Sequence, residues 1–191
     1  MEWVEFTTHG DGRLIAGGRR GSGPPVLLLH GGPGLGFEYL RGLADELAGE
    51  NDVAWYQQRG QEPSAVEGPY TVAADVGDAR RVLDALDWEK AYVVGHSWGG
   101  QLALHVAEVM PERLLGVLAV DPLGAVGDGR WPEFDEEMSR RTPEAVRERA
   151  RELDELSTAG EADDELALEG FALVWPAYFA DPDAAPPMPE V

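Results

Sequence analysis

The chain has 191 residues, 43% of them hydrophobic, which is enough for one ordinary domain with a buried core. Its formal net charge of −21 argues against nucleic acid and anionic membranes as partners, because both would repel it. The apolar runs are too short to span a bilayer, and the acidic start is not a secretory signal, so we predict a cytoplasmic protein. The chain has no cysteine, which excludes disulfides and thiolate metal sites.

The first half alternates short apolar runs with helical patterns, which is typical of an α/β sheet. One helix is predicted over 37–47, where apolar residues share a face. A second is predicted after Thr71, which can cap it, with Asp75 in its early turns. A third carries Leu102 and Val106 and is stopped by Pro111. Six strands are predicted, at 2–7, 14–16, 24–30, 51–57, 90–95 and 114–121.

From Trp131 the composition becomes charged and helical, which predicts a boundary between a core at 1–128 and a segment at 129–191. Thr142 is predicted to cap one helix, whose apolar stripe includes Ala150 and Leu153. Another helix should start near Asp163 and end at Pro176, before a proline-rich tail.

Gly95-His96-Ser97-Trp98-Gly99 fits the G-x-S-x-G pattern between a strand and a helix. In this pattern the serine sits in a strained conformation at the apex of a turn, and small residues on both sides let strand and helix pass closely. The turn places Ser97 at a helix start, where the N–H of Trp98 would face an oxyanion. We interpret this stretch as a serine nucleophile; the alternative is an ordinary glycine turn.

"LLLHGGPG" ends a predicted strand at His30 and leaves the following backbone free of bulky side chains. An exposed N–H of this glycine loop (residues 30–34) could supply a second oxyanion donor. The alternative is a turn that only connects strand to helix. The presence of the serine turn further along favours the functional interpretation.

These two motifs resemble the α/β-hydrolase superfamily and, within it, the proline iminopeptidase-like branch. The resemblance implies an α/β-hydrolase fold with a mostly parallel sheet, flanking helices and the start of a helical cap after Asp121. It implies Ser97 as nucleophile and an oxyanion hole formed by the N–H groups of Gly32 and Trp98. His30, Gly31, Gly95 and Gly99 would support them.

The chain departs from the branch at two positions of the stretch after the fourth strand, where Gln57 replaces an aspartate and Glu62 a glycine. A further departure concerns the base. The superfamily places an acid and then a histidine after the serine, beyond the strands counted here. We therefore expect the last strands, and the catalytic histidine with them, to be missing from this chain.

The four histidines present do not fit the role of the base. His9 lies in the first hairpin, His30 should hold the glycine loop, the side chain of His96 should diverge from Ser97, and His105 lies two helical turns beyond it. Asp121 ends the sixth strand, where some members of the superfamily place their acid. It is a possible alternative acid, against the alternative of a hydrogen-bonding residue at the start of the cap.

Candidate substrate-binding residues are also present in the second segment. Glu133, Glu161 and Glu169 could bind a free amine, although a solvated acidic helix face explains them as well. Trp175, Tyr178 and Phe179 could line a pocket or pack the helices together. The net charge also has two explanations. It can serve solubility, or it can provide a field that attracts cationic substrates.

We predict a serine hydrolase that acts through an acyl-enzyme on an ester or amide, the amides including an N-terminal proline peptide, without metal or cofactor. The expected partner is a small molecule or short peptide. The alternatives are a non-catalytic binding protein on a hydrolase scaffold or one half of a two-chain enzyme. Missing strands would leave an exposed sheet edge, at which self-association or a complementing chain is possible.

Overall fold

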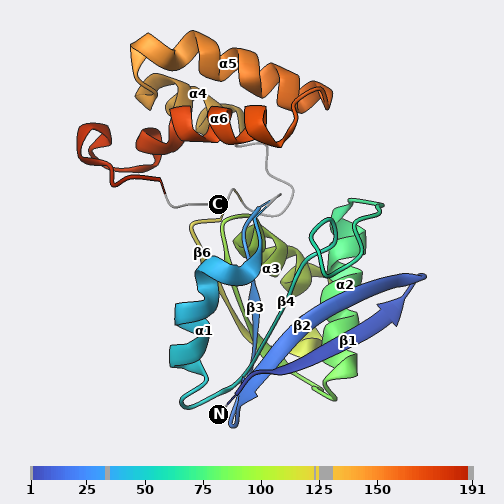
Figure 1. Cartoon of the computed structure of the whole chain (residues 1–191). Helices are drawn as coiled ribbons and strands as arrows, with labels where there is room; N and C mark the ends of the chain where they lie inside the picture. Colours follow the sequence, from blue (N-terminus) through green and yellow to red (C-terminus); the bar gives the residue numbers. More distant parts are fainter. Residues whose placement is uncertain (1, 33–34, 123, 125–130, 189–191) are drawn as a thin grey trace. The chain divides into compact units, whose positions relative to one another are not determined.

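The computed structural model describes residues 2–32, 35–122, 124 and 131–188 (Figure 1). The chain divides into two compact units, Met1–Asp128 and Gly129–Val191. Each unit is described by itself below. Within the described ranges, no helix is both long and apolar enough to cross a membrane.

The first unit is built on a six-stranded sheet with the order β1-β2-β4-β3-β5-β6. β1 and β2 are antiparallel to each other, β2 is antiparallel to β4, and the remaining neighbours are parallel. The strands are β1 (Val4–Gly10), β2 (Arg13–Gly21), β3 (Pro25–Leu29), β4 (Asp52–Tyr56), β5 (Ala91–His96) and β6 (Leu114–Val120). The prediction of six strands in a mostly parallel sheet is confirmed.

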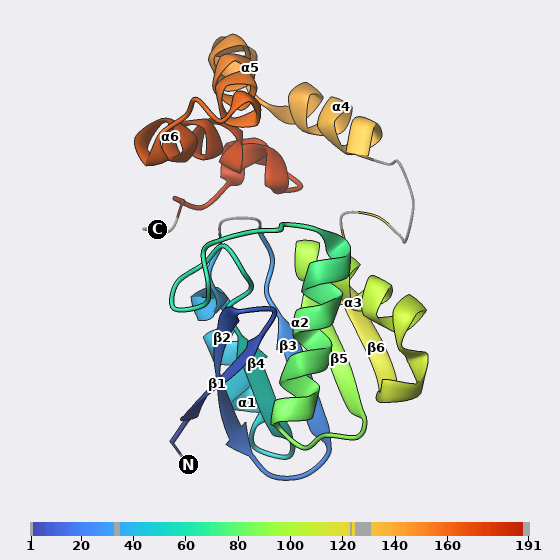
Figure 2. The same ribbon diagram turned by 90° about the vertical axis from the view of Figure 1, so that its right-hand side faces the viewer.

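Helices cover both faces of this sheet (Figure 2). α1 (Arg41–Leu47), preceded by a 3-10 turn at Phe37–Leu40, lies on one face, and α2 (Val72–Ala85) and α3 (Trp98–Val109) lie on the other. The predicted cap is confirmed, since the Thr71 hydroxyl accepts the N–H of Ala74 at 3.2 Å. A helix cap of this kind satisfies a donor that the first turn leaves free.

Alternating side chains of the central strands pack into two separate cores, one on each face of the sheet. Leu27 and Leu29 of β3 belong to the larger cluster beneath α2 and α3, whereas Val26 and Leu28 belong to the smaller cluster beneath α1. The sheet therefore holds the turn at the end of β5 between two layers, and the larger core supports it from the α2–α3 side.

The second unit contains α4 (Trp131–Arg141), α5 (Glu144–Ala159) and α6 (Asp164–Val174), followed by 3-10 turns at Trp175–Tyr178 and Pro182–Ala184. The predicted apolar stripe is confirmed by the burial of Ala150 and Leu153. The predicted helix start near Asp163 is confirmed, and Asp163 caps α6, because its carboxylate accepts the N–H of Leu166 at 2.9 Å.

The predicted cap at Thr142 is wrong. Its hydroxyl donates to the carbonyl oxygen of Met138 at 2.8 Å, one turn back in α4, so the side chain belongs to the preceding helix. The residue that precedes α5 is Pro143, whose side chain makes no capping hydrogen bond. The hydroxyl is thus turned towards the end of α4, and no capping bond to α5 is formed.

Candidate active site

Ser97 occupies the turn between β5 and α3, in a strained backbone conformation. Its φ and ψ angles are 54° and −122°, outside the regions that non-glycine residues ordinarily adopt. The cost of such a conformation is about 1–3 kcal/mol. The surroundings hold it in place, since the Ser97 N–H donates to the carbonyl oxygen of Val120 in the next strand at 2.9 Å.

The glycines around Ser97 are required by the close passage of strand and helix. A Cβ on Gly95 would lie 2.0 Å from the carbonyl oxygen of Gly99, and a Cβ on Gly99 would lie 2.2 Å from that of Leu29. Both neighbours are backbone atoms and have no room to move. The supporting role that the sequence predicts for these two glycines thus has a steric basis.

Trp98, the first residue of α3, has a backbone N–H without an intrahelical acceptor. The positive end of the helix dipole lies at the same place. The hydroxyl of Ser97 has no hydrogen-bond partner within the part of the chain that the structure describes. This combination offers a nucleophile beside a donor suited to a negatively charged oxygen.

The glycine loop lies beside the serine. A Cβ on Gly31 would lie 3.1 Å from the Ser97 Cβ, and the N–H of Gly31 donates to the Tyr39 hydroxyl at 2.6 Å. Gly32 has a φ angle of 150°, a backbone conformation suited to glycine. The structure thus brings the two predicted motifs together, although Pro33 and Gly34 of the loop lie outside the described residues.

His30 is buried, and both of its ring nitrogens are engaged. Nε2 accepts the backbone N–H of Gln58 at 3.0 Å, which places the ring proton on Nδ1, and Nδ1 donates to the carbonyl oxygen of Gly31 at 2.7 Å. Burial lowers the pKa of His30 below its ordinary value, against the opposing effect of the Gly31 bond. A neutral imidazole without a free nitrogen holds the loop and cannot take a proton from Ser97.

Gln58 is a site residue that sequence reasoning missed. Its side-chain amide donates to the carbonyl oxygen of His30 at 2.6 Å and accepts the indole N–H of Trp98 at 3.0 Å. It therefore joins the glycine loop to the residue after the serine. The signal that could identify it is the Gln-Gln-Arg-Gly stretch that follows β4. Its first residue, Gln57, accepts the N–H of Phe37 at 2.8 Å.

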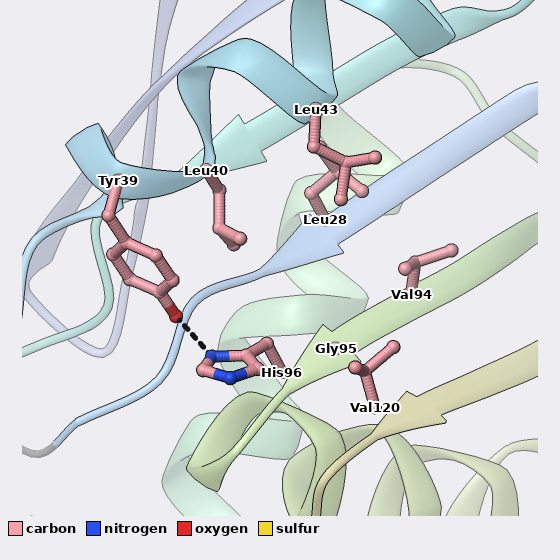
Figure 3. Close-up of a pocket in the computed structure, with 8 residues that line it drawn as sticks. All are labelled: Leu28, Tyr39, Leu40, Leu43, Val94, Gly95, His96 and Val120. Carbon is pink, nitrogen blue, oxygen red and sulfur yellow. Dashed lines mark hydrogen bonds between the residues drawn. The ribbon is translucent and has the colours of Figure 1, made fainter. Parts of the chain in front are cut away.

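His96 lines an apolar cavity of about 290 Å³, and Figure 3 shows its ring beside the hydroxyl of Tyr39. The Tyr39 hydroxyl lies 2.9 Å from its Nδ1 and, having accepted the Gly31 N–H, can donate its own proton there. Leu28, Leu40, Leu43, Val94 and Val120 form the apolar lining. The cavity lies on the α1 face of the sheet, so His96 is not placed to serve Ser97.

His9 and His105, which the sequence excludes as the base, and the candidate acid Asp121 are not brought to the serine by any described contact. Nδ1 of His105 lies 3.8 Å from a carboxylate oxygen of Glu108, one turn on in α3, and His9 lies in β1. Asp121 follows β6, is exposed and has a φ angle of 43°. Within the described residues, no group of three or more histidines and carboxylates could hold a metal ion.

Glu169 and the aromatic candidates of the second unit have partners inside it. The Glu169 carboxylate accepts two hydrogen bonds from Arg149, at 2.8 and 2.9 Å. Trp175 packs against Phe179, with ring centroids 5.1 Å apart, and against Phe171 at 5.8 Å. Glu133 and Glu161 are exposed. The aromatic residues therefore pack this unit together.

Comparison with known proteins identifies the family. The sequence model of the alpha/beta hydrolase fold family matches residues 24–169, most of the chain. The chain belongs to this family. Epoxide hydrolase B of Mycobacterium tuberculosis is 38% identical over 101 residues, which are 51% of this chain and 28% of that protein. A proline iminopeptidase of Lactobacillus acidophilus is 31% identical over 132 residues, 65% of this chain and 43% of that protein.

Solved structures show the same α/β-hydrolase fold. An epoxide hydrolase from an endophytic Streptomyces is 33% identical and superposes with a TM-score of 0.57 over 60% of this chain and 36% of its own. The chain spans between about a quarter and a half of the length of these curated and solved relatives. What the comparisons show is thus a hydrolase family and its fold.

Proposed function

We propose that Ser97 is the nucleophile of a serine hydrolase that cleaves an ester or amide through an acyl-enzyme. The observation that carries the proposal is the strained serine at the start of α3, with a free helix N–H on one side and the glycine loop on the other. The Ser97 oxygen attacks the carbonyl carbon, and the N–H groups of Gly32 and Trp98 stabilise the oxygen as it becomes negative. Water then releases the acyl group.

We further propose a place in the proline iminopeptidase-like branch, with a small ester, amide or N-terminal proline peptide as substrate. The stretches HGGPG and GHSWGG and the 31% identity to an iminopeptidase support it. Helices α4 to α6 would then be the start of a cap. Substrate choice depends on groups beyond the serine turn, so the shared motifs leave several acyl substrates open.

This chain alone should turn over slowly, because none of its four histidines serves Ser97 as a base. All four lie in the described part of the chain, and the two nearest in sequence or space, His30 and His96, are engaged with Gln58, Gly31 and Tyr39. This observation also favours the second candidate function, a binding protein or one half of a two-chain enzyme built on the hydrolase scaffold.

Hydrolysis of p-nitrophenyl butyrate, with and without added imidazole, tests the proposal. Imidazole in solution can act as the absent base. We expect slow hydrolysis that increases with imidazole by more than the increase seen with the Ser97→Ala variant. Ser139→Ala, at an exposed serine of α4, is the matched control and should behave like the unaltered chain. Equal rates for the unaltered chain and Ser97→Ala at every imidazole concentration would favour the binding protein.

A further inference from the structure

A second cavity adjoins the candidate active site. It has a volume of about 510 Å³, and its lining includes His30 and Gly31 of the glycine loop, Trp98 beside the serine, and Asp75 of α2. Because Gly31 and Trp98 also flank Ser97, a group held in this cavity would be next to the proposed nucleophile. The apolar cavity of Figure 3 lies on the opposite face of the sheet and is separate from it.

The Asp75 carboxylate is largely buried without a hydrogen-bond donor. Its side chain is 13% exposed, and within the described residues it accepts no hydrogen bond. The nearest cation is the Arg59 guanidinium, whose Nε lies 3.6 Å from Oδ1, beyond hydrogen-bonding distance. A buried carboxylate normally accepts hydrogen bonds. The Asp75 oxygens can therefore still accept hydrogen bonds from a molecule in the cavity.

Arg59 cannot fill this capacity, because its hydrogen bonds go elsewhere. Nε and Nη2 donate to the two oxygens of Asp78, at 2.7 and 2.8 Å, and Nη1 donates to the carbonyl oxygen of Pro69 at 3.0 Å. The Asp78 side chain is 1% exposed, so the bidentate pair is shielded from water. Arg59 is thus already matched by one carboxylate, and Asp75 is the carboxylate left over.

The charged groups around Asp75 also leave its carboxylate incompletely stabilised. Burial raises the pKa of Asp75 to about 6, which outweighs the lowering effect of Arg59. His30, in the lining of the same cavity, is neutral, as shown above. The other charged and titratable groups of the elements packed around Asp75 are Tyr56 of β4, Tyr70 before α2, Asp78 and Arg81 of α2, Asp11 of the turn between β1 and β2, and Arg13 of β2.

We propose that this cavity binds the protonated amine of a small substrate, with the Asp75 carboxylate as its counter-ion. An alkylammonium group supplies the hydrogen bonds that Asp75 lacks and adds a positive charge to that of Arg59 at 3.6 Å. The side chains of Tyr70, Val72 and Trp98 offer apolar and aromatic surface to the attached carbon chain. That the amine belongs to a substrate rests on the proposed function, whereas amine binding itself does not require that Ser97 reacts.

Three probes of equal chain length separate this proposal from its alternatives. The full chain, labelled with 15N, is titrated at pH 7 with n-butylammonium, 1-butanol or butyrate, and the indole N–H of Trp98 and the side-chain amide of Gln61 are followed by NMR. We expect saturable shifts with butylammonium, at least about tenfold weaker binding of butanol, and no binding of butyrate, which Asp75 would repel. Equal binding of amine and alcohol, tighter binding of butyrate, or no binding of any probe would overturn the proposal.

Variants and pH identify the residue responsible. Asp75→Asn should remove the preference for the amine over the alcohol, whereas Asp84→Asn, an exposed carboxylate of the same helix, should keep it. The association constant for butylammonium should rise about tenfold between pH 5 and pH 7, as Asp75 ionises, while that for butanol stays constant. Far-UV circular dichroism checks that each variant is folded. An unchanged preference in Asp75→Asn contradicts the assignment.

The Ser97→Ala variant distinguishes this proposal from the proposed function. It should bind butylammonium as the unaltered chain does, because Asp75 and the cavity lining are intact. If hydrolysis fails but amine binding depends on Asp75, the cavity stands and the nucleophile assignment falls. If hydrolysis depends on Ser97 but amine and alcohol bind alike, the reverse holds.

Discussion

The two faces of the sheet in the first unit differ in how they are covered, although the same strands supply both. On the α2–α3 face, Ala91 and Val93 of β5 are fully buried. On the α1 face, Tyr92 of the same strand is 43% exposed, and Leu118 and Val120 of β6 are 57% and 38% exposed. The serine turn packs on the α2–α3 face, so its geometry is supported although the α1 side of β5 and β6 is exposed.

The packing that fixes the serine turn therefore lies on the α2–α3 side of the sheet. Gly99, at the start of α3, lies against backbone of β3, and the larger core continues beneath α2 and α3. Residues on the α1 side of β5 and β6 contribute little burial. Substitutions of the same kind should therefore have larger effects in the core beneath α2 and α3 than on the α1 side of β5 and β6.

The largest effect is expected for Gly95→Ala. The new methyl group would meet the backbone of Gly99 at 2.0 Å, and neither strand nor helix can yield without disturbing Ser97. We expect a loss of stability of about 3 kcal/mol or more, or failure to fold. The measurement is urea denaturation followed by circular dichroism.

Gly77→Ala is the matched control for that experiment. Nothing lies within 4 Å of a Cβ at this position of α2, so alanine should stabilise the helix by about 0.5–1 kcal/mol. If Gly95→Ala were as harmless as Gly77→Ala, the close packing of the serine turn would be wrong.

A pair of leucine truncations compares the two faces directly. Leu102 of α3 is fully buried in the larger core, and Leu102→Ala should cost about 2–5 kcal/mol. Leu118→Ala removes a side chain that is 57% exposed, so its cost should be below about 1 kcal/mol. Both values come from urea unfolding of the full chain. Similar losses would mean that the α1 face of β6 is covered after all.

Asp75→Asn should stabilise the protein above pH 6. The pKa of the carboxyl is about 6 in the folded chain and 3.8 ordinarily, so the folded state holds the proton more tightly. Protonation therefore favours the folded state below pH 3.8, and this contribution is lost as the pH rises through 6. At pH 7 the variant should be more stable by roughly 1–3 kcal/mol, and at pH 4 the difference should vanish.

Urea unfolding at both pH values measures this difference, with Asp84→Asn as the control. That carboxylate is exposed and pairs with Arg113 on the surface, so its removal should change stability by less than about 1 kcal/mol. A stability difference for Asp75→Asn that does not change with pH would show that the carboxylate is not held in a desolvated place.

The smallest effect on stability, with a clear effect on association, is expected for Leu118→Lys. We propose that the bare apolar surface of β5 and β6 promotes self-association or pairing with a complementing chain, because β6 has no charged residue along its length. A lysine there should lower the fraction of oligomer in sedimentation velocity and leave unfolding nearly unchanged. An equal oligomer fraction in both proteins would locate the association elsewhere.

The sequence predicted the fold well, because its signals are local. Apolar runs identified the six strands, and Gly95-His96-Ser97-Trp98-Gly99 located the strained turn. The capping role predicted for Thr142 is wrong because its hydroxyl lies between two helices, and the sequence pattern does not show to which helix it bonds. The bond from Trp98 to Gln58 joins residues forty positions apart, and no local pattern encodes such a contact.

Asp75 illustrates the same limit. The sequence shows a carboxylate in the first turns of a helix, where the helix dipole alone explains it. That Arg59 is taken by Asp78, so that Asp75 is left without a donor, depends on three side chains meeting in space. Such a leftover group is recognisable only once every neighbouring hydrogen bond has been assigned.

The most direct test of the central claim, that the supported face of the sheet presents Ser97 as a nucleophile, is its reaction with an alkyl fluorophosphonate. The full chain is incubated with the reagent and imidazole, and peptide mass spectrometry locates the adduct. We predict a single adduct on Ser97, which is absent in Ser97→Ala. The exposed Ser139 should stay unmodified over the same time. Modification of Ser97 no faster than that of Ser139 would contradict the account.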